Sequence, residues 1–272
     1  MSLSVQTNIN AMDAHRNLGN TQAMLAKSME KLSSGYRINR AADDAAGLAI
    51  AMKLSAQIGG LGQAQRNAQD AVSMVQTAEG ALNEVHSMLL RLRDLAVQYN
   101  NGTLSTSDQA QITAEVAQLC SEISRIGTQT SFNNISLLTG TSAITFQVGA
   151  KDNETITTNA VALFGSGSSF SVDSALFSFS GSSVTLASID TAIDNVSTKR
   201  ANFGAVQNRL EHTLNNLSTY EENLQASESR IKDVDMASEM VNFTKLQILS
   251  QAGTSMLAQA NQSPQSVLSL LR

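Results

Sequence analysis

Proline, tryptophan and cysteine are nearly absent from this chain of 272 residues, which contains one proline, no tryptophan and one cysteine. Proline interrupts helices because it lacks a backbone N–H and its ring clashes with the preceding turn. A chain with a single proline can therefore form very long helices, and we expect the last of them to end near Pro264. Aromatic residues make up only 4% of the chain, so these helices must pack mainly through small side chains.

The same scarcities exclude several classes of protein. One cysteine rules out an internal disulfide framework and any multi-cysteine metal site. Cys120 lies in an apolar helical pattern, so we interpret it as a small buried side chain, with a reactive thiol as the alternative. The net charge of −5 argues against a nucleic-acid partner. No apolar run reaches about 18 residues, so we expect no membrane-spanning helix, and the first residues do not resemble a cleavable secretory signal.

Motifs that carry catalysis or hold a cofactor are also missing. His15, His86 and His212 are scattered, and none lies in a metal-binding arrangement. The segment 33–35 (SSG) lacks the flanking residues of a nucleophile elbow, and the chain has no phosphate-binding loop. We therefore expect a protein that is not an enzyme and that needs no cofactor or metal.

What the chain has instead is a long stripe of apolar residues at intervals of three and four. The stripe consists of Leu61, Ala64, Ala68, Ala71, Val75, Ala78, Leu82, Val85, Leu89, Leu92, Ala96 and Tyr99. This heptad spacing predicts a helix about 58 Å long with coiled-coil packing. Asn100, Asn101 and Gly102 would end it, because Asn and Gly tolerate the left-handed conformation.

Two further stripes predict two more helices. The first stripe consists of Ile112, Val116, Leu119, Ile123 and Ile126, with Ser107 and Asp108 as candidate caps and a break at Gly127 and Thr128. The second consists of Ile189, Ile193, Val196, Phe203, Leu210, Leu214, Leu217, Leu224 and Ile231, interrupted by polar residues, with Ser188 or Asp190 as the candidate cap. Such caps satisfy the free N–H groups of the first helical turn. The three stripes predict a mainly α fold, an elongated antiparallel coiled-coil bundle.

Both ends of the chain carry apolar residues at helical spacing and few charges. The residues that we expect to drive assembly are Val5, Ile9, Met12, Leu25 and Leu32 at one end and Met240, Phe243, Leu249, Met256 and Leu257 at the other. Each end alone would form an amphipathic helix whose apolar face has no partner except the other end or another molecule. We therefore expect the two ends to pair, with the chain running out and back.

The central segment, 141–187, differs from the rest because about a third of it is Ser or Thr. Alternating residues predict strands over 144–148 and 154–158, joined by a turn over 149–153. The glycine- and serine-rich stretch 165–169 predicts a loop tip. We expect a small β-hairpin region, too short to form a domain, inserted at the far end of the helical rod.

Several segments resemble the terminal signatures of bacterial flagellin. They are VQTNINA at 5–11, LSSGYRIN at 32–39, ADDAAGLAI at 42–50, NRLE at 208–211, ENL at 222–224, SESRIKD at 227–233, MLAQANQ at 256–262 and VLSLL at 267–271. The resemblance covers about 1–140 and 187–272, in order and without large gaps. It implies a structural subunit that polymerises head-to-tail into the extracellular flagellar filament for swimming motility. Two alternatives stay open: a hook–filament junction protein, and a coiled-coil adaptor that does not polymerise.

The resemblance also implies how the chain is divided. Residues 1–42 with 233–272 would form a coiled-coil layer lining the filament core, and residues 43–140 with 188–232 a rod layer around it. Residues 141–187 would face outward, where many flagellins carry larger β domains, so the filament should be thin and smooth. The terminal segments are expected to be disordered in the free subunit and to fold on assembly, because their apolar stripes have no partner.

The partners implied by the resemblance are other copies of the chain, the flagellar export machinery, an export chaperone, and cap and junction proteins. The segment 89–98 (LLRLRDLAVQ) also resembles the part of flagellin that animal Toll-like receptor 5 recognises. By that likeness Arg91 and Glu115 would make the polar contacts and Leu95 the apolar contact. We expect packing between subunits to be the primary role of these three residues, with the receptor contact incidental.

Overall fold

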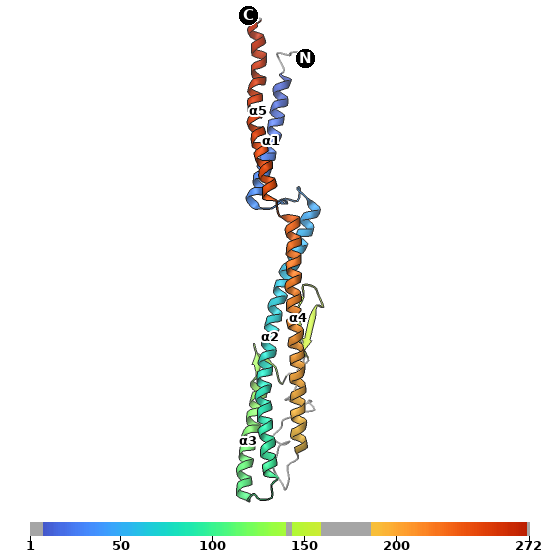
Figure 1. Ribbon diagram of the computed structural model, residues 1–272, viewed down its shortest axis with the longest axis vertical. Helices are drawn as coiled ribbons and strands as arrows, with labels where there is room; N and C mark the ends of the chain where they lie inside the picture. Colours follow the sequence, from blue (N-terminus) through green and yellow to red (C-terminus); the bar gives the residue numbers. More distant parts are fainter. Residues whose placement is uncertain (1–7, 140–142, 159–185, 271–272) are drawn as a thin grey trace. The chain divides into compact units, whose positions relative to one another are not determined.

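The computed structural model describes residues 8–139, 143–158 and 186–270 (Figure 1). Within these ranges the chain forms helices α1 (Ile9–Ser34), α2 (Ala45–Tyr99), α3 (Thr106–Gln129), α4 (Leu186–Lys232) and α5 (Met236–Leu270), and strands β1 (Ser131–Phe132), β2 (Ile135–Ser136), β3 (Ile144–Gln147) and β4 (Thr155–Thr158). The chain divides into a terminal unit, Met1–Ala56 with Asn223–Arg272, and a bundle unit, Gln57–Glu222. The mainly α class with a small β region is confirmed.

The bundle unit is held together by one apolar core that α2, α3 and α4 share. All twelve residues of the long stripe predicted for α2 are buried, and none is more than 9% exposed. Ile123 of α3 and Ile189, Val196 and Leu210 of α4 belong to the same cluster. The heptad spacing therefore identified the core-facing side of α2 correctly, and α2 ends at Tyr99, just before the predicted stop.

The start of α3 differs from the prediction by two residues. The N-cap is Ser105, whose hydroxyl oxygen accepts a hydrogen bond from the backbone N–H of Asp108, while Asp108 accepts from the backbone N–H of Ser105. Ser107 was the wrong cap, because only Ser105 has an acidic residue three positions later, as a capping box requires. The helix also continues through Gly127 to Gln129, with Gly127 buried.

The other two predicted helix limits were also wrong. Helix α4 begins at Leu186, so Ser188 and Asp190 lie inside its first turns, and Asp190 instead pairs with Arg93 of α2 at 2.7 Å. Helix α5 continues past Pro264 to Leu270. Proline is disfavoured inside a helix because it removes one hydrogen bond, but the helix on either side can continue.

The predicted hairpin is present, but at a different place. Strands β3 and β4 pair antiparallel, and Asn153 in the turn has a φ of 69°. The hairpin lies beside the middle of α2: Asn67 donates to the carbonyl oxygen of Gln147 at 3.1 Å, and Ala150 packs against Gly60. Gly60 is about 58 Å along α2 from its end at Tyr99, so the placement at the far end was wrong. The predicted loop tip at 165–169 lies outside the described residues.

A second hairpin, β1–β2, has no counterpart among the predicted strands. Ser131 pairs with Ser136 and Phe132 with Ile135. The two residues between the strands, Asn133 and Asn134, have φ values of 47° and 63°. Two left-handed residues in a two-residue loop are typical of the tightest hairpins, and Asn adopts this conformation more readily than other residues with a side chain.

In the terminal unit α1 and α5 run antiparallel, side by side (Figure 1). Over residues 11–32 of α1 and 239–260 of α5, every third or fourth residue is more buried than most of its neighbours, and these residues form the α1–α5 seam. Its members are Ala11, Ala14, Leu18, Thr21, Leu25, Ser28 and Leu32 of α1 and Glu239, Phe243, Leu246, Ser250, Gly253, Leu257 and Ala260 of α5. The two ends of the chain thus pair with one another, as predicted.

Candidate assembly surface on the terminal helix pair

Polar and close contacts fix the register of the α1–α5 seam. Ser28, which is 3% exposed, donates its hydroxyl to Oε1 of Glu239 at 2.5 Å. Near the other end of the seam the Asn8 amide donates to the carbonyl oxygen of Ala260 at 2.8 Å. Between them Gly253 faces Leu18 so closely that an added Cβ would lie 3.2 Å from Leu18 Cδ1.

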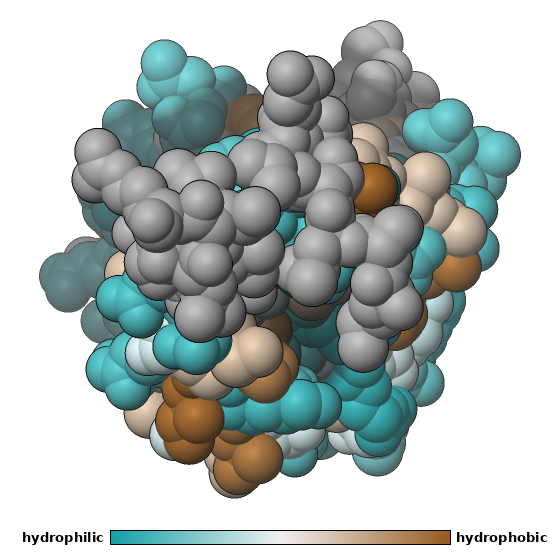
Figure 2. Space-filling model, turned by 90° about the horizontal axis from the view of Figure 1, so that it is seen from above, coloured by the Kyte–Doolittle hydropathy of each residue, from teal (hydrophilic) through white to brown (hydrophobic). Residues whose placement is uncertain are grey.

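The sides of the same pair that face away from the seam carry many exposed large apolar side chains within the described residues. Ten large apolar side chains of α1 and α5 are between 46% and 69% exposed: Ile9, Met12, Met24, Met29, Met236, Met240, Val241, Ile248, Leu249 and Met256. Figure 2 shows hydrophobic residues at the surface of the molecule beside hydrophilic ones. Isolated exposed apolar residues are ordinary, but a set of this size on two adjacent helices is typical of an interaction surface. We call these ten residues the outer face.

The predicted assembly residues divide between the seam and the outer face. Leu25, Leu32, Phe243 and Leu257 are half-buried in the seam, whereas Ile9, Met12, Met240, Leu249 and Met256 are exposed on the outer face. Val5 lies outside the described residues. Because the seam residues are partners for one another, the expectation that these stripes have no partner within the chain holds only for the outer face.

Two of the most exposed members of the outer face, Val241 and Ile248, were not predicted. They are seven residues apart on α5 and so lie on one side of the helix. Their spacing of seven is visible in the sequence, but Val241 directly follows the predicted Met240 and Ile248 directly precedes the predicted Leu249.

Four hollows on the terminal unit each have one methionine in their lining. Their volumes are about 840 Å³ at Met29, 330 Å³ at Met24, 430 Å³ at Met240 and 450 Å³ at Met12. A flexible, polarizable thioether adapts to irregular neighbours, which suits a surface that must accept side chains from another molecule.

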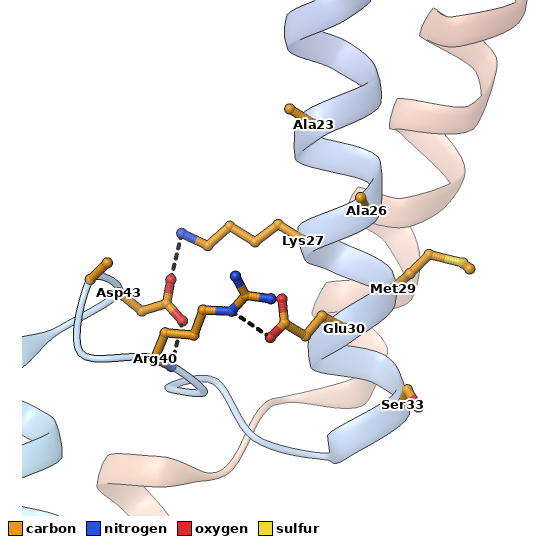
Figure 3. Close-up of a pocket in the computed structure, with 9 residues that line it drawn as sticks. Ala23, Ala26, Lys27, Met29, Glu30, Ser33, Arg40 and Asp43 are labelled. Atoms are coloured by element: carbon orange, nitrogen blue, oxygen red, sulfur yellow. Dashed lines mark hydrogen bonds and ion pairs between the residues drawn. The ribbon is translucent and has the colours of Figure 1, made fainter.

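The largest hollow lies between α1 and the loop that leads to α2, where four charges are paired (Figure 3). Lys27 pairs with Asp43 at 2.7 Å, and Arg40 pairs with Glu30 at 2.9 Å. The same Asp43 carboxylate accepts from the backbone N–H groups of Asn39 and Arg40 at 3.2 Å. The hydrogen bond from Lys27, followed by that from the Arg40 backbone, lowers the pKa of Asp43 to about 2. These pairs anchor the loop to α1.

The structure brings together two of the segments that carry the flagellin resemblance, 32–39 and 227–233. The backbone N–H of Arg37 donates to the carbonyl oxygen of Lys232 at 2.7 Å, and the Lys232 ammonium lies 4.3 Å from the centre of the Tyr36 ring. A cation above an aromatic ring is attracted by the negative face of the ring. The loop after α1 is therefore attached to the end of α4.

Of the three residues assigned to receptor binding, two are accessible. Arg91 of α2 and Glu115 of α3 form an ion pair at 2.8 Å, and their side chains are 54% and 44% exposed. Leu95 is only 1% exposed and belongs to the core of the bundle unit. Its assignment as the apolar contact does not fit this structure, because its side chain fills the core and cannot touch a partner.

Outside the terminal unit, the thiol of Cys120 is buried in α3, and burial raises its pKa to about 11. A protonated, buried thiol is a poor nucleophile, so the interpretation of Cys120 as a small buried side chain is confirmed. None of the helices in the described ranges combines the length and apolar character needed to cross a membrane.

Comparison with known protein families gives two matches that cover both ends of the chain. The profile of the bacterial flagellin N-terminal helical region matches residues 5–143, and the profile of the bacterial flagellin C-terminal helical region matches residues 186–271. The α1–α5 pair and the helices of the bundle unit fall within these two matches.

Individual relatives are similar over nearly the whole chain. The flagellin of Halalkalibacterium halodurans is 51% identical, covering 98% of this chain and 99% of that protein. The flagellin of Bacillus subtilis is 46% identical, covering 99% and 100%. The flagellar filament 33 kDa core protein of Treponema phagedenis is 45% identical, covering 98% and 99%. Matches at both ends, and relatives alike from end to end, show that the chain belongs to the bacterial flagellin family.

Proposed function

We propose that this chain builds the flagellar filament by burying the outer face of its terminal helix pair against other copies of itself. As a flagellin it is a structural subunit of the filament that serves motility. The ten exposed apolar side chains of the outer face carry the proposal. Burying each of them further would contribute about 1 kcal/mol, and head-to-tail contacts that do not close on themselves produce a helical polymer.

The two units differ in whether their apolar surface is already buried, and this difference supports a different position in the filament for each. The bundle unit buries its long apolar stripe inside the chain, so it needs no neighbour to complete its core. The terminal unit leaves its outer face uncovered. We infer that residues 1–42 and 233–272 line the filament core and that residues 43–140 and 188–232 surround them. Residues 141–187 would face outward and give a thin, smooth filament, and we infer no enzymatic activity.

Partners other than the chain itself follow from the family. A component of the flagellar filament is extracellular, so we infer that subunits pass through the flagellar export machinery. An export chaperone would cover the outer face of the terminal unit before assembly, and cap and junction proteins would meet it at the filament ends. The alternatives, a hook–filament junction protein and a non-polymerising adaptor, are favoured neither by the family match nor by the relatives.

Seeded polymerisation tests the assembly proposal. Full-length subunits mixed with sheared filament fragments should sediment as polymer. An Ile248→Asp subunit should need about a tenfold higher concentration to do so, because a buried carboxylate without a partner is costly. The matched Ile248→Leu subunit keeps an apolar side chain of the same size and should polymerise normally. Wild-type subunits that stay monomeric on these seeds would overturn the proposal.

We also infer that the exposed Arg91–Glu115 pair provides the polar contact for Toll-like receptor 5, while Leu95 acts only through the core. Cells that carry the receptor should respond less to an Arg91→Ala subunit than to the wild type, because a charge-assisted contact is lost. Arg125→Ala is the control, since Arg125 is a similarly exposed arginine paired with Glu122 of the same helix. An undiminished response to Arg91→Ala would contradict the assignment.

A further inference from the structure

The methionines of the terminal unit and those of the bundle unit differ in solvent exposure. Of the nine that the structure describes, seven are between 48% and 64% exposed, and all seven belong to the terminal unit. Six of these are on the helix pair: Met12, Met24, Met29, Met236, Met240 and Met256. The seventh, Met52, is on α2. In the bundle unit Met74 is buried in the core, and Met88 is half-buried against it.

Methionine is common in cores, but among the described residues the highly exposed methionines all lie in the terminal unit. Six of the ten residues on the outer face are methionine. The other four are Ile9, Val241, Ile248 and Leu249, which no mild oxidant attacks. Met12, Met24, Met29 and Met240 also help to line the four hollows, so part of each residue borders a space that a small solute can enter.

We propose that the six methionines of the helix pair are oxidation sites, and that their conversion to the sulfoxide in the free subunit prevents its incorporation into the filament. This inference rests on the proposed function, because it requires the outer face to be buried by other copies. Oxidised subunits would then be excluded from the growing filament. Subunits already assembled would be shielded from the oxidant by their neighbours.

The oxidant is a peroxide, and the step is a two-electron oxygen transfer. The thioether sulfur attacks one oxygen of hydrogen peroxide, the O–O bond breaks, and a sulfur–oxygen bond forms. The hydroxide that leaves takes up the remaining proton and departs as water. The sulfur is oxidised to the sulfoxide, and the peroxide is reduced. The product is a polar group in place of an apolar one, and it must be desolvated wherever the outer face is buried.

The oxidisable sulfur atoms of the bundle unit are poorly placed to compete. Cys120 is buried as the protonated thiol, which reacts far more slowly than a thiolate. Met74 is only 4% exposed. A loss of assembly after brief treatment with peroxide would therefore originate in the terminal unit.

The first test treats the full-length subunit with increasing hydrogen peroxide, removes the oxidant, and measures oxidation by peptide mass spectrometry and assembly by seeded sedimentation. The six methionines should oxidise before Met74 and Met88. The sedimented fraction should fall about tenfold or more as they do, because sulfoxides would be buried in the subunit contacts. Untreated subunits that fail to assemble would overturn the proposed function itself. Oxidised subunits that assemble as well as untreated ones would overturn only this inference.

Matched variants locate the effect. A subunit with all six replaced by leucine, a volume-conserving change, should keep after peroxide nearly the whole of the assembly that the same variant shows without peroxide. Met52→Leu is the control, because Met52 and Met12 are both 64% exposed but Met52 is not on the helix pair. The Met52→Leu subunit should lose assembly as the wild type does. Protection by Met52→Leu, or none by the sixfold variant, would overturn the inference.

A second measurement needs no variant. Preformed wild-type filaments and free subunits receive the same peroxide, and the oxidation rate of each methionine is compared. The six methionines should react at least about tenfold more slowly in the filament, because neighbouring subunits exclude the oxidant there. Equal rates in the two states would overturn the inference whatever the variants do.

Discussion

Asp43 shows how a single carboxylate fixes the loop that follows α1. Its side chain is 13% exposed and receives hydrogen bonds from the Lys27 ammonium and from two backbone N–H groups. The adjacent Asp44 acts on the next element, because it accepts a hydrogen bond from the N–H of Gly47 at 2.8 Å and so begins α2. Two consecutive acidic residues thus hold the loop at one side and start a helix at the other.

A dependence of stability on pH follows from Asp43. Its pKa is lowered from 3.8 to about 2 in the folded chain, so the carboxylate stabilises the fold fully above pH 3.8 and loses this effect as the pH falls toward 2. The midpoint of thermal unfolding of the free subunit should therefore be higher for wild type than for Asp43→Asn near neutral pH. The difference should vanish at a pH of about 2. Asp13→Asn, which removes an exposed carboxylate of α1, is the control, and a difference that persists in acid would contradict the assignment.

At the scale of an element, the α1–α5 seam is unusual in its composition. Half of its fourteen positions hold Ala, Ser, Thr or Gly, so the two helices can approach closely, as Gly253 and Leu18 do. The hydrogen bond between Ser28 and Glu239 lies inside this seam. A buried polar pair contributes less to stability than to register, because any other alignment leaves one member without its partner.

Removal of the Ser28 hydroxyl should weaken the helix pair. Ser28→Ala leaves the Glu239 carboxylate in the seam without its donor, at a cost of about 1–3 kcal/mol. Circular dichroism during thermal unfolding of the assembled filament, where the pair is folded, should show a lower midpoint than wild type. Ser33→Ala changes an exposed serine of the same helix and should have little effect. Equal losses for the two variants would show that the hydrogen bond does not stabilise the pair.

The sequence allowed the bundle unit to be predicted far better than the assembly surface. Its heptad stripe is regular because large apolar residues face a complete core, so spacing alone identified the buried side of α2. In the terminal unit the seam positions include Ala14, Ser28 and Gly253, whereas Met12 and Ile248 face outward. Large apolar residues there occur both in the seam and on the outer face, so hydrophobic spacing alone does not separate the two.

Other features depend on contacts that no local pattern contains. The placement of β3–β4 beside Gly60 and Asn67 results from packing between distant parts of the chain. The burial of Leu95 follows from the way α2 is covered by its neighbours in the core, although its sequence context resembles an exposed recognition segment. The β1–β2 turn, in contrast, has a local signal in the sequence, the adjacent pair Asn133 and Asn134.

On the scale of the whole molecule, the two units differ in whether they are complete. The core of the bundle unit draws on α2, α3 and α4 and includes residues from Ala68 to Leu210, with none from α5. The terminal unit consists largely of a helix pair whose outer face is uncovered. One unit therefore has its core within a single chain, whereas the other exposes the surface that a neighbour would cover.

Deletion of residues 236–272 separates these two properties. The truncated chain should remain helical, because the core of the bundle unit is intact, but it should not polymerise, because half of the terminal pair is missing. Far-UV circular dichroism and seeded sedimentation measure the two properties independently. The matched full-length chain must do both under the same conditions. A general loss of helical signal in the truncated chain would contradict the independence of the bundle core.

The narrow seam between α1 and α5 has a thermodynamic consequence. Two helices joined at half of their contact positions through small side chains gain less from each other than a seam of large apolar residues would give. Much of the free energy that keeps them folded must therefore come from the copies that cover their outer face. Each neighbour then acts as a ligand of the folded pair, and its contribution rises with the logarithm of subunit concentration. Folding of the chain ends and growth of the polymer are coupled in one equilibrium, and dilution, without any denaturant, shifts both in the same direction.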